Sequence, residues 1–259
     1  MGTVLALFRA GVRRQASYRL ALASGLLTNV FFGIVRTALF LALYRNASDV
    51  AGFDQADALT YVWVLQALFG AIWTPWLFEL PDRIRSGDFV SELTRPGDPL
   101  VRHFAFDLGR ISSFLALRAP GPLFVAAIVL DLNLPTSVPG WGAFVLSICV
   151  ASVVAAELRF LIGAIAFWSP DYRGIFALVF IPIWFFSGFL IPTVYFPDAL
   201  QQIANLSPLV AMLMAPVAVA TGQSVPAALA VQVFWAGAMW IVCRAVMTRA
   251  TSRLVVFGG

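Results

Sequence analysis

Three charged residues lie within apolar stretches that are long enough to cross a membrane. Arg36 falls deep in the stretch 20–44, and Glu157 and Arg159 fall in the middle of the stretch 141–168. A charge at the bilayer centre costs about 2.5–3.5 kcal/mol on insertion scales, so such groups normally face the bundle interior and pair. Residues two apart cannot share one helix face. We therefore expect Glu157 to pair with Arg36 across helices, and Arg159 to snorkel or to face a neighbouring subunit.

Two roles are open for these intramembrane charges. A buried ion pair can fix the register between two helices. Alternatively, the same groups can form a polar patch on a substrate pathway and separate when that pathway opens.

Motifs for soluble catalysis are missing from the sequence. It contains no Gly-rich phosphate loop of the G-x-x-x-x-G-K-S/T kind, no H-E-x-x-H and no G-x-S-x-G. His103 lies in a charged loop and is expected to be a surface residue and no ligand. Cys149 and Cys243 have no metal spacing and are expected at different membrane depths, without a disulfide. Any energised work must therefore draw on an ion gradient or on another subunit.

The composition is that of an integral membrane protein. Of the 259 residues, 61% are hydrophobic and 12% are charged, whereas a soluble domain is about 45–50% apolar and about 25% charged. There is too little polar surface to cover a soluble globule. The net charge of +4 is compatible with acidic partners, but in a membrane protein the placement of charges says more, and we expect no nucleic-acid partner.

Six stretches are apolar and long enough to cross about 30 Å of hydrocarbon as helices. They are 20–44, 58–78, 111–130, 141–168, 175–191 and 227–246. A seventh, 206–221, has only 16 residues and contains two prolines. The prediction is an all-α membrane protein with a single transmembrane domain over 1–259. Residues 1–19 are either a basic amphipathic helix in the membrane interface or a cytoplasmic extension of the first span, and we favour the interfacial helix.

The arginines predict the orientation of the chain. They cluster before the first span, between the second and third, and after the last, and Arg173 alone lies between the fourth and fifth. By the positive-inside rule both termini are cytoplasmic. A crossing by the seventh stretch would carry the Arg-rich tail outside, so we predict that residues 192–224 form an external or re-entrant segment. Irregular backbone at that depth must be buried in protein or line a wet cavity.

Residues 79–110 form the one long loop predicted on the cytoplasmic side. The loop mixes arginines with acidic residues, carries apolar residues at helical spacing, and is punctuated by Pro96 and Pro99. It is longer than a tight connection requires. It is either a solvated loop of balanced charge or a docking element for a cytoplasmic partner, and we favour docking.

Two segments resemble those of a known family. IRSGDFVSELTRPGDPL at 84–100 is similar to the coupling region of ABC-2 type permeases, the membrane subunits of the type V exporter fold. SGFLIPTVYFPDALQQIANLSP at 187–208 resembles the broken segment that these permeases carry between spans five and six. The order of the interfacial helix, six spans and long first cytoplasmic loop extends the resemblance to nearly the whole chain. The first segment is closest to the branch with two permeases beside one ATPase.

The resemblance implies that the loop at 79–110 docks on a separate cytoplasmic ATPase. The apolar anchors would be Ile84, Phe89 and Leu93. Asp88 and Glu92 would face basic groups on the ATPase. The remaining contact residues are Arg83, Arg85 and Gly87, the last as a turn.

The resemblance also implies that the broken segment caps the outer end of the pathway. Its prolines remove backbone donors and stop helices, and Asp198 would face water or the exit. The residues assigned to this element are Gly188, Pro192, Pro197, Asp198 and Pro208. The alternative is an external loop tucked against the bundle.

The function implied is that of a permease subunit of an ATP-driven exporter in the bacterial cytoplasmic membrane, with no enzyme activity of its own. ATP and Mg would bind to the partner ATPase, and this chain would hold no cofactor and no metal. A second permease, identical or related, would complete the pathway. The substrate would be a hydrophobic or amphipathic compound such as a drug, an antibiotic or a lipid, as in multidrug efflux.

Two other functions compete with this interpretation. An ion-coupled secondary transporter would use Glu157 as its coupling site, but the sequence shows no inverted repeat with paired broken helices. An intramembrane enzyme, such as a lipid head-group transferase, needs clustered carboxylates or histidines, which the sequence lacks.

Overall fold

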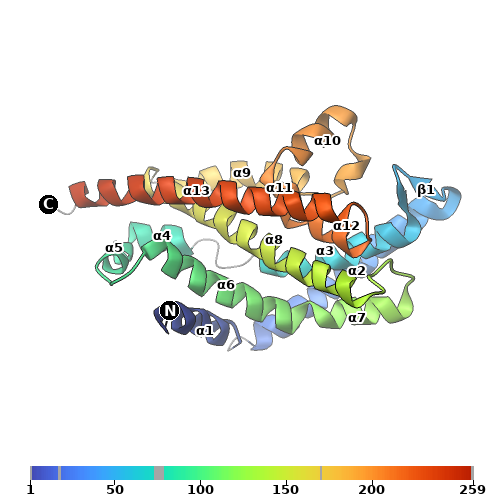
Figure 1. The fold of residues 1–259 in the computed structure, drawn as a ribbon, viewed down its shortest axis with the longest axis horizontal. Coiled ribbons are helices and arrows are strands. Elements are labelled where there is room, and N and C mark those ends of the chain that lie inside the picture. Colours follow the sequence, from blue (N-terminus) through green and yellow to red (C-terminus); the bar gives the residue numbers. More distant parts are fainter. Residues whose placement is uncertain (1, 17–18, 73–78, 170, 258–259) are drawn as a thin grey trace.

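The computed structural model describes residues 2–16, 19–72, 79–169 and 171–257, and most of these residues are helical (Figure 1). The longer helices run side by side along one axis. They are α2 (Arg19–Leu43), α3 (Gln55–Ile72), α6 (Pro99–Arg118), α7 (Pro120–Val129), α8 (Val138–Ala164), α9 (Tyr172–Phe186) and α13 (Val225–Phe257). The remaining α-helices are α1 (Gly2–Ala16), α4 (Glu79–Arg85), α5 (Asp88–Leu93), α10 (Asp198–Asn205), α11 (Pro208–Met212) and α12 (Met214–Ala220). A small antiparallel hairpin pairs β1 (Asp49–Val50) with β2 (Phe53–Asp54).

Among the described residues, four helical segments are long and apolar enough to cross a membrane: Ser24–Asn46, Pro99–Val129, Val138–Phe167 and Val225–Ser252. Large apolar side chains on their outer faces are widely exposed, such as Leu39 at 67% and Ile241 at 69%. Outward-facing apolar surface on this scale is stable in lipid and not in water. The chain is therefore an all-α, multi-pass membrane protein, as the composition predicts.

Two of the six predicted spans have shorter counterparts. The stretch 58–78 begins within α3, which is the most buried of the long helices, and residues 73–78 lie outside the described part of the chain. The stretch 175–191 corresponds to α9, an apolar helix of 15 residues. Their membrane crossing stays a prediction.

The third predicted span begins earlier than 111. The Asp98 side chain accepts hydrogen bonds from the backbone N–H of Leu100 at 2.9 Å and of Val101 at 3.3 Å, and Pro99 occupies the first helical turn. This is a strong start signal, because the cap satisfies free N–H groups and proline fixes a helical φ. The predicted loop 79–110 is therefore two short helices followed by the first twelve residues of α6.

The predicted N-terminal helix is present as α1, which lies against α6 (Figure 1). The two backbones approach closely at two glycines. A Cβ on Gly11 would lie 2.2 Å from the Phe106 carbonyl oxygen, and one on Gly109 would lie 2.1 Å from the Phe8 carbonyl oxygen. Residue numbers rise along α1 as they fall along α6, so the helices are antiparallel. Residues 1, 17 and 18 of the predicted interfacial segment lie outside the described chain.

The segment 192–224 consists of short helices. α10 projects from the bundle (Figure 1), whereas α11 and α12 pack against α8 and α13, and α12 also packs against α3. Gln232 of α13 is fully buried and ties these parts together, because its amide donates to the Ala211 carbonyl at 2.9 Å and to the Ser147 carbonyl at 3.1 Å. At about 1.5 Å per residue, neither α11 nor α12 spans a bilayer alone.

Candidate functional site

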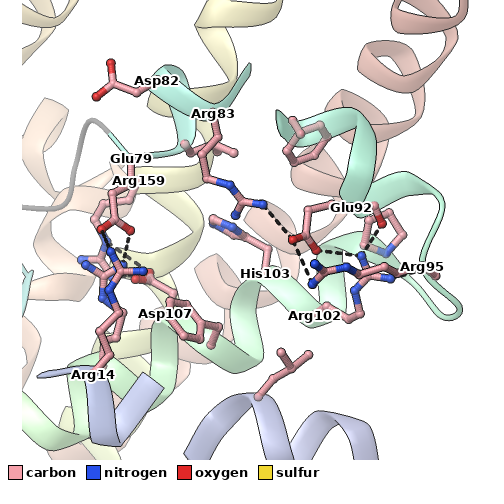
Figure 2. A pocket seen from close by; sticks show the side chains of 16 residues that line it. Arg14, Glu79, Asp82, Arg83, Glu92, Arg95, Arg102, His103, Asp107 and Arg159 are labelled. Atoms are coloured by element: carbon pink, nitrogen blue, oxygen red, sulfur yellow. Dashed lines mark hydrogen bonds and ion pairs between the residues drawn. The ribbon is translucent and has the colours of Figure 1, made fainter. Parts of the chain in front are cut away.

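A charged pocket of about 440 Å³ lies between the short helices α4 and α5 and the facing sides of α1, α6 and α8 (Figure 2). Six arginines and four acidic residues line it, together with His103 and several apolar side chains. The charged residues are Arg14, Arg83, Arg95, Arg102, Arg110, Arg159, Glu79, Asp82, Glu92 and Asp107. Most of these groups are joined in two clusters.

The first cluster surrounds Glu92 of α5. Its carboxylate accepts hydrogen bonds from Arg83 at 2.7 Å and from Arg102 at 2.9 Å, and Arg95 lies 3.3 Å away. Burial alone would raise the pKa of Glu92, but the hydrogen bonds from Arg102 and Arg83 outweigh burial and hold this pKa below its usual value. Arg102 also donates to the backbone carbonyls of Arg95 and Pro96. The cluster therefore fixes the turn between α5 and α6.

The second cluster joins α1, α4, α6 and α8. Glu79 accepts from Arg14 at 2.7 Å and from Arg110 at 2.6 Å. Asp107 of α6 accepts from Arg159 of α8 at 2.8 Å, and both side chains are only 7% exposed. The expectation that Arg159 snorkels or faces a subunit interface is wrong, since its partner is Asp107 in the helical part of the predicted loop.

His103 stands between the two clusters (Figure 2). Its ring is half-buried, with its centre 5.5 Å from that of Phe160 and 5.6 Å from that of Phe104. The expectation of a surface histidine in a loop is wrong, because residue 103 belongs to the first turns of α6 and faces α8.

α4 and α5 form a helical hairpin around Gly87. Gly87 has φ of +81°, a left-handed conformation that glycine adopts without strain, so the predicted turn is confirmed. The Ser86 hydroxyl donates to the Asp88 carboxylate at 2.7 Å beside it. Five residues of this turn are exposed, and we call them the hairpin tip: Arg85, Ser86, Gly87, Asp88 and Val90.

The apolar residues of the hairpin face the other way. Ile84 and Phe89 are 8% and 3% exposed, and Leu93 is half-buried beside them. The Phe89 ring packs edge-on against Phe167, with ring centres 5.2 Å apart. These three side chains belong to the core of this chain, so they are not the exposed anchors of a docking surface that the sequence suggested. Glu92 is likewise engaged by arginines of its own chain.

The other intramembrane charges do not pair with each other. The Arg36 guanidinium lies over the Phe189 ring, 4.4 Å from its centre. Glu157 is 1% exposed, its Oε2 atom has no hydrogen-bond partner, and its backbone carbonyl faces the thiol of Cys243 on α13. The predicted Arg36–Glu157 ion pair is therefore wrong.

The segment 187–208 begins with a tightly held turn. Gly188 has φ of +78°, and a Cβ there would lie 2.6 Å from the Met214 side chain. Its carbonyl accepts a hydrogen bond of 2.6 Å from the hydroxyl of Tyr61, which is fully buried in α3. The turn after α9 is thus fixed to the centre of the bundle.

The prolines of this segment each precede or begin a short helix. Pro192 precedes the 3-10 turn Thr193–Tyr195, Pro197 precedes α10, and Pro208 is the first residue of α11. Asp198 is exposed in the first turn of α10, where its negative charge stabilises the helix by interacting with the helix dipole.

Comparison with known proteins identifies the family. Residues 31–258 match the family described as ABC-2 family transporter protein. No match was found among the curated proteins or among the solved structures. The matched residues contain the hairpin, the charged pocket apart from its α1 side, and the segment 187–208. The chain belongs to the ABC-2 transporter family.

Proposed function

We propose that this chain is the permease subunit of an ATP-driven ABC-2 exporter. It would form half of the translocation pathway, with a second copy or a related permease forming the other half. A separate cytoplasmic ATPase would bind ATP and Mg and drive the cycle. The family assignment over residues 31–258 is the observation that carries this proposal.

The arrangement of the helices supports the predicted topology. Both chain ends and the α4–α5 hairpin lie at one end of the bundle, and the β1–β2 hairpin lies at the other (Figure 1). Six spans, made by α2, α3, α6–α7, α8, α9 and α13, would place both termini on the same side. By the positive-inside rule, the arginines of α1, the hairpin and α13 support the proposal that this side is cytoplasmic.

The hairpin tip is the surface proposed to dock on the ATPase. It contains two exposed charges of opposite sign, Arg85 and Asp88, and one exposed apolar side chain, Val90 at 46% exposure. Behind the tip, the first cluster, around Glu92, and the second cluster, around Glu79 and Asp107, connect α4 and α5 to α1, α6 and α8. A push on the tip would therefore move the cytoplasmic ends of these helices together.

The segment 192–224 is proposed to be re-entrant and to close the outer end of the pathway. The buried positions of α11 and α12 between α3, α8 and α13 support this role. Irregular backbone within a bilayer is tolerated only where protein or a wet cavity surrounds it.

The test is to tag the chain, express it with its genomic neighbours and identify what co-purifies in mild detergent. We expect a stoichiometric ABC ATPase. Val90→Asp should remove the ATPase while leaving the yield and melting temperature of the permease unchanged, because Val90 has little contact to lose. Val138→Asp is the matched control, because it makes the same change at a valine that is 87% exposed. Val138 is the first residue of α8, at the end far from the hairpin, so this variant should keep the ATPase.

Absence of an ATPase from the wild-type preparation would overturn the proposal. If Val90→Asp kept the ATPase, the hairpin tip would not be the docking surface. Ile84→Asp and Phe89→Asp are unsuitable for this test because they place a charge in the core.

One observation favours ion-coupled transport as the second candidate. The Glu157 carboxylate is buried without a hydrogen bond to Oε2, and intramembrane carboxylates of this kind serve proton relays in pumps. Uptake or efflux that follows an imposed proton gradient in vesicles containing this chain without any ATPase would support that candidate over the exporter.

A further inference from the structure

Arg36 of α2 is a cation without a counter-charge in the described part of the chain. Its Nη1 atom is buried and has no hydrogen-bond partner. By contrast, Arg102, Arg110 and Arg159 each have a carboxylate oxygen within 2.9 Å. The phenol of Tyr61 interacts electrostatically with Arg36, but its hydroxyl already donates to the Gly188 carbonyl.

The depth of Arg36 disfavours a lipid headgroup as the missing partner. It lies twelve residues after the start and ten before the end of the span Ser24–Asn46. At about 1.5 Å per residue, the guanidinium starts about 15 Å from either end. A snorkelling side chain reaches the interface only from near a helix end.

An aromatic surface adjoins the guanidinium. Phe189, directly beneath Arg36, stacks on Phe69 of α3 with ring centres 4.4 Å apart and meets Trp184 of α9 at 4.8 Å. Phe180 continues the row, 4.7 Å from Trp184. Phe69, Trp184, Phe180 and Arg36 itself are only half-buried, whereas Phe189 between them is 6% exposed, so the edges of the row and part of the cation stay accessible.

We propose that Arg36 and this aromatic row bind the transported compound, and that this compound is an amphipathic anion. A carboxylate, sulfonate or phosphate would accept from the guanidinium, which binds such groups in a bidentate manner. The apolar, preferably aromatic, body would lie along Phe189, Phe69 and Trp184. That the anion is carried rests on the proposed exporter function, but its binding to this chain does not.

The direct test uses two fluorescent probes with the same aromatic body. Anilinonaphthalene sulfonate carries a negative charge, and phenylnaphthylamine lacks it. Binding of each is titrated on the purified full complex in phosphatidylcholine nanodiscs, with empty nanodiscs subtracted. We expect Arg36→Gln to weaken binding of the sulfonate at least about tenfold, as expected for losing a hydrogen bond to a charged group, and to leave phenylnaphthylamine binding within about twofold.

Two further variants keep the test decisive. Arg36→Lys retains the positive charge and should retain most of the sulfonate binding. Arg45→Gln removes an exposed arginine just beyond the same helix and should change neither probe. Unchanged phenylnaphthylamine binding also reports that Arg36→Gln has folded.

Three results would overturn the inference. Equal loss of both probes in Arg36→Gln would show a structural role for the guanidinium. Displacement of the sulfonate by phosphatidylglycerol in the nanodisc would assign the site to a lipid headgroup. Dissociation of the permease pair in Arg36→Gln would assign Arg36 to a carboxylate of the second subunit. None of these readouts requires ATP hydrolysis, so each is distinct from failure of the exporter proposal.

Discussion

Removal of Asp107 should destabilise the helix bundle strongly, because it leaves the Arg159 guanidinium charged and buried. The two side chains connect α6 to α8 at 2.8 Å, and each is 7% exposed. Asp107→Asn preserves the shape of the side chain, removes its charge and replaces one acceptor oxygen by an NH2 donor. The change therefore separates the ion pair and its hydrogen bonds from packing.

The expected loss of unfolding free energy follows from the burial of the Asp107–Arg159 ion pair. Breaking a buried ion pair by removing one partner costs about 3–5 kcal/mol, whereas replacing both partners by neutral groups is often neutral or stabilising. For a chain of this size, such a loss corresponds to a drop in Tm of about 6–20 °C. Arg159→Met should cost less than Asp107→Asn, because Arg110 also acts electrostatically on Asp107.

The assay is a double-mutant cycle on the purified protein, read as the free energy of unfolding and as Tm. The double variant Asp107→Asn, Arg159→Met should be more stable than Asp107→Asn alone. Arg14→Gln is the control, since the Arg14–Glu79 pair is half exposed and Glu79 keeps Arg110; its loss should stay below about 1 kcal/mol. The reasoning would be refuted if each single variant lost less than about 1 kcal/mol of unfolding free energy and the two losses simply added in the double variant.

Three further predictions concern other parts of the molecule. Gly109→Ala should displace α1 from α6, because its Cβ would lie 2.1 Å from the Phe8 carbonyl oxygen, whereas Gly121→Ala meets nothing within 4 Å; protease cleavage of α1 in the first variant alone checks this. The folded pKa of Glu92 lies below its ordinary value of 4.5, so its stabilisation is complete above pH 4.5 and is lost as the pH falls through the folded pKa. Glu92→Gln should flatten the fall in Tm over that acidic range, and an unchanged fall would contradict the assignment. Glu157→Gln should not lower Tm, because the buried Oε2 atom has no partner to lose; ATP-driven transport should persist, whereas ion-coupled transport would be abolished.

Local sequence signals were sufficient for the elements that depend on local chemistry. The apolar stretches predicted the long helices, and the resemblance of the segment 84–100 to a known coupling region predicted the turn at Gly87. The start of α6 was missed because Pro99 was interpreted as an interruption. Together with Asp98, it is a helix start that satisfies two backbone N–H groups.

The same boundary error explains the wrong ion pairs. With residues 79–110 treated as a loop, Asp107 was not counted among the charges available to Arg159, and Glu157 and Arg36 were left to pair with each other. The true partners are 52 residues apart in sequence, and only the packing of α6 on α8 brings them together. A helix that starts at the Asp98–Pro99 pair includes Asp107 on its third turn, where its carboxylate can reach a neighbouring helix.

Periodicity also cannot say which molecule covers an apolar face. Ile84, Phe89 and Leu93 do form one face of the hairpin, as their spacing suggested, but that face closes on the chain's own core. The same limit applies to Tyr61, whose bond to the Gly188 carbonyl joins residues 127 positions apart. An aromatic residue in an apolar helix carries no local sign of such a bond.

The glycine contact between α1 and α6 sets an order of events during synthesis. Gly11 leaves the ribosome 98 residues before Gly109, and each of these glycines lies against the backbone of the other helix. At about 5–20 residues per second, α1 waits about 5–20 s before its binding surface exists. During that time its apolar side, which includes Leu7 and Phe8, lacks its final partner. The headgroup layer that receives α2 is the nearest surface that accepts a basic amphipathic helix. Docking of α1 on α6 would then mark the completion of the first half of the bundle.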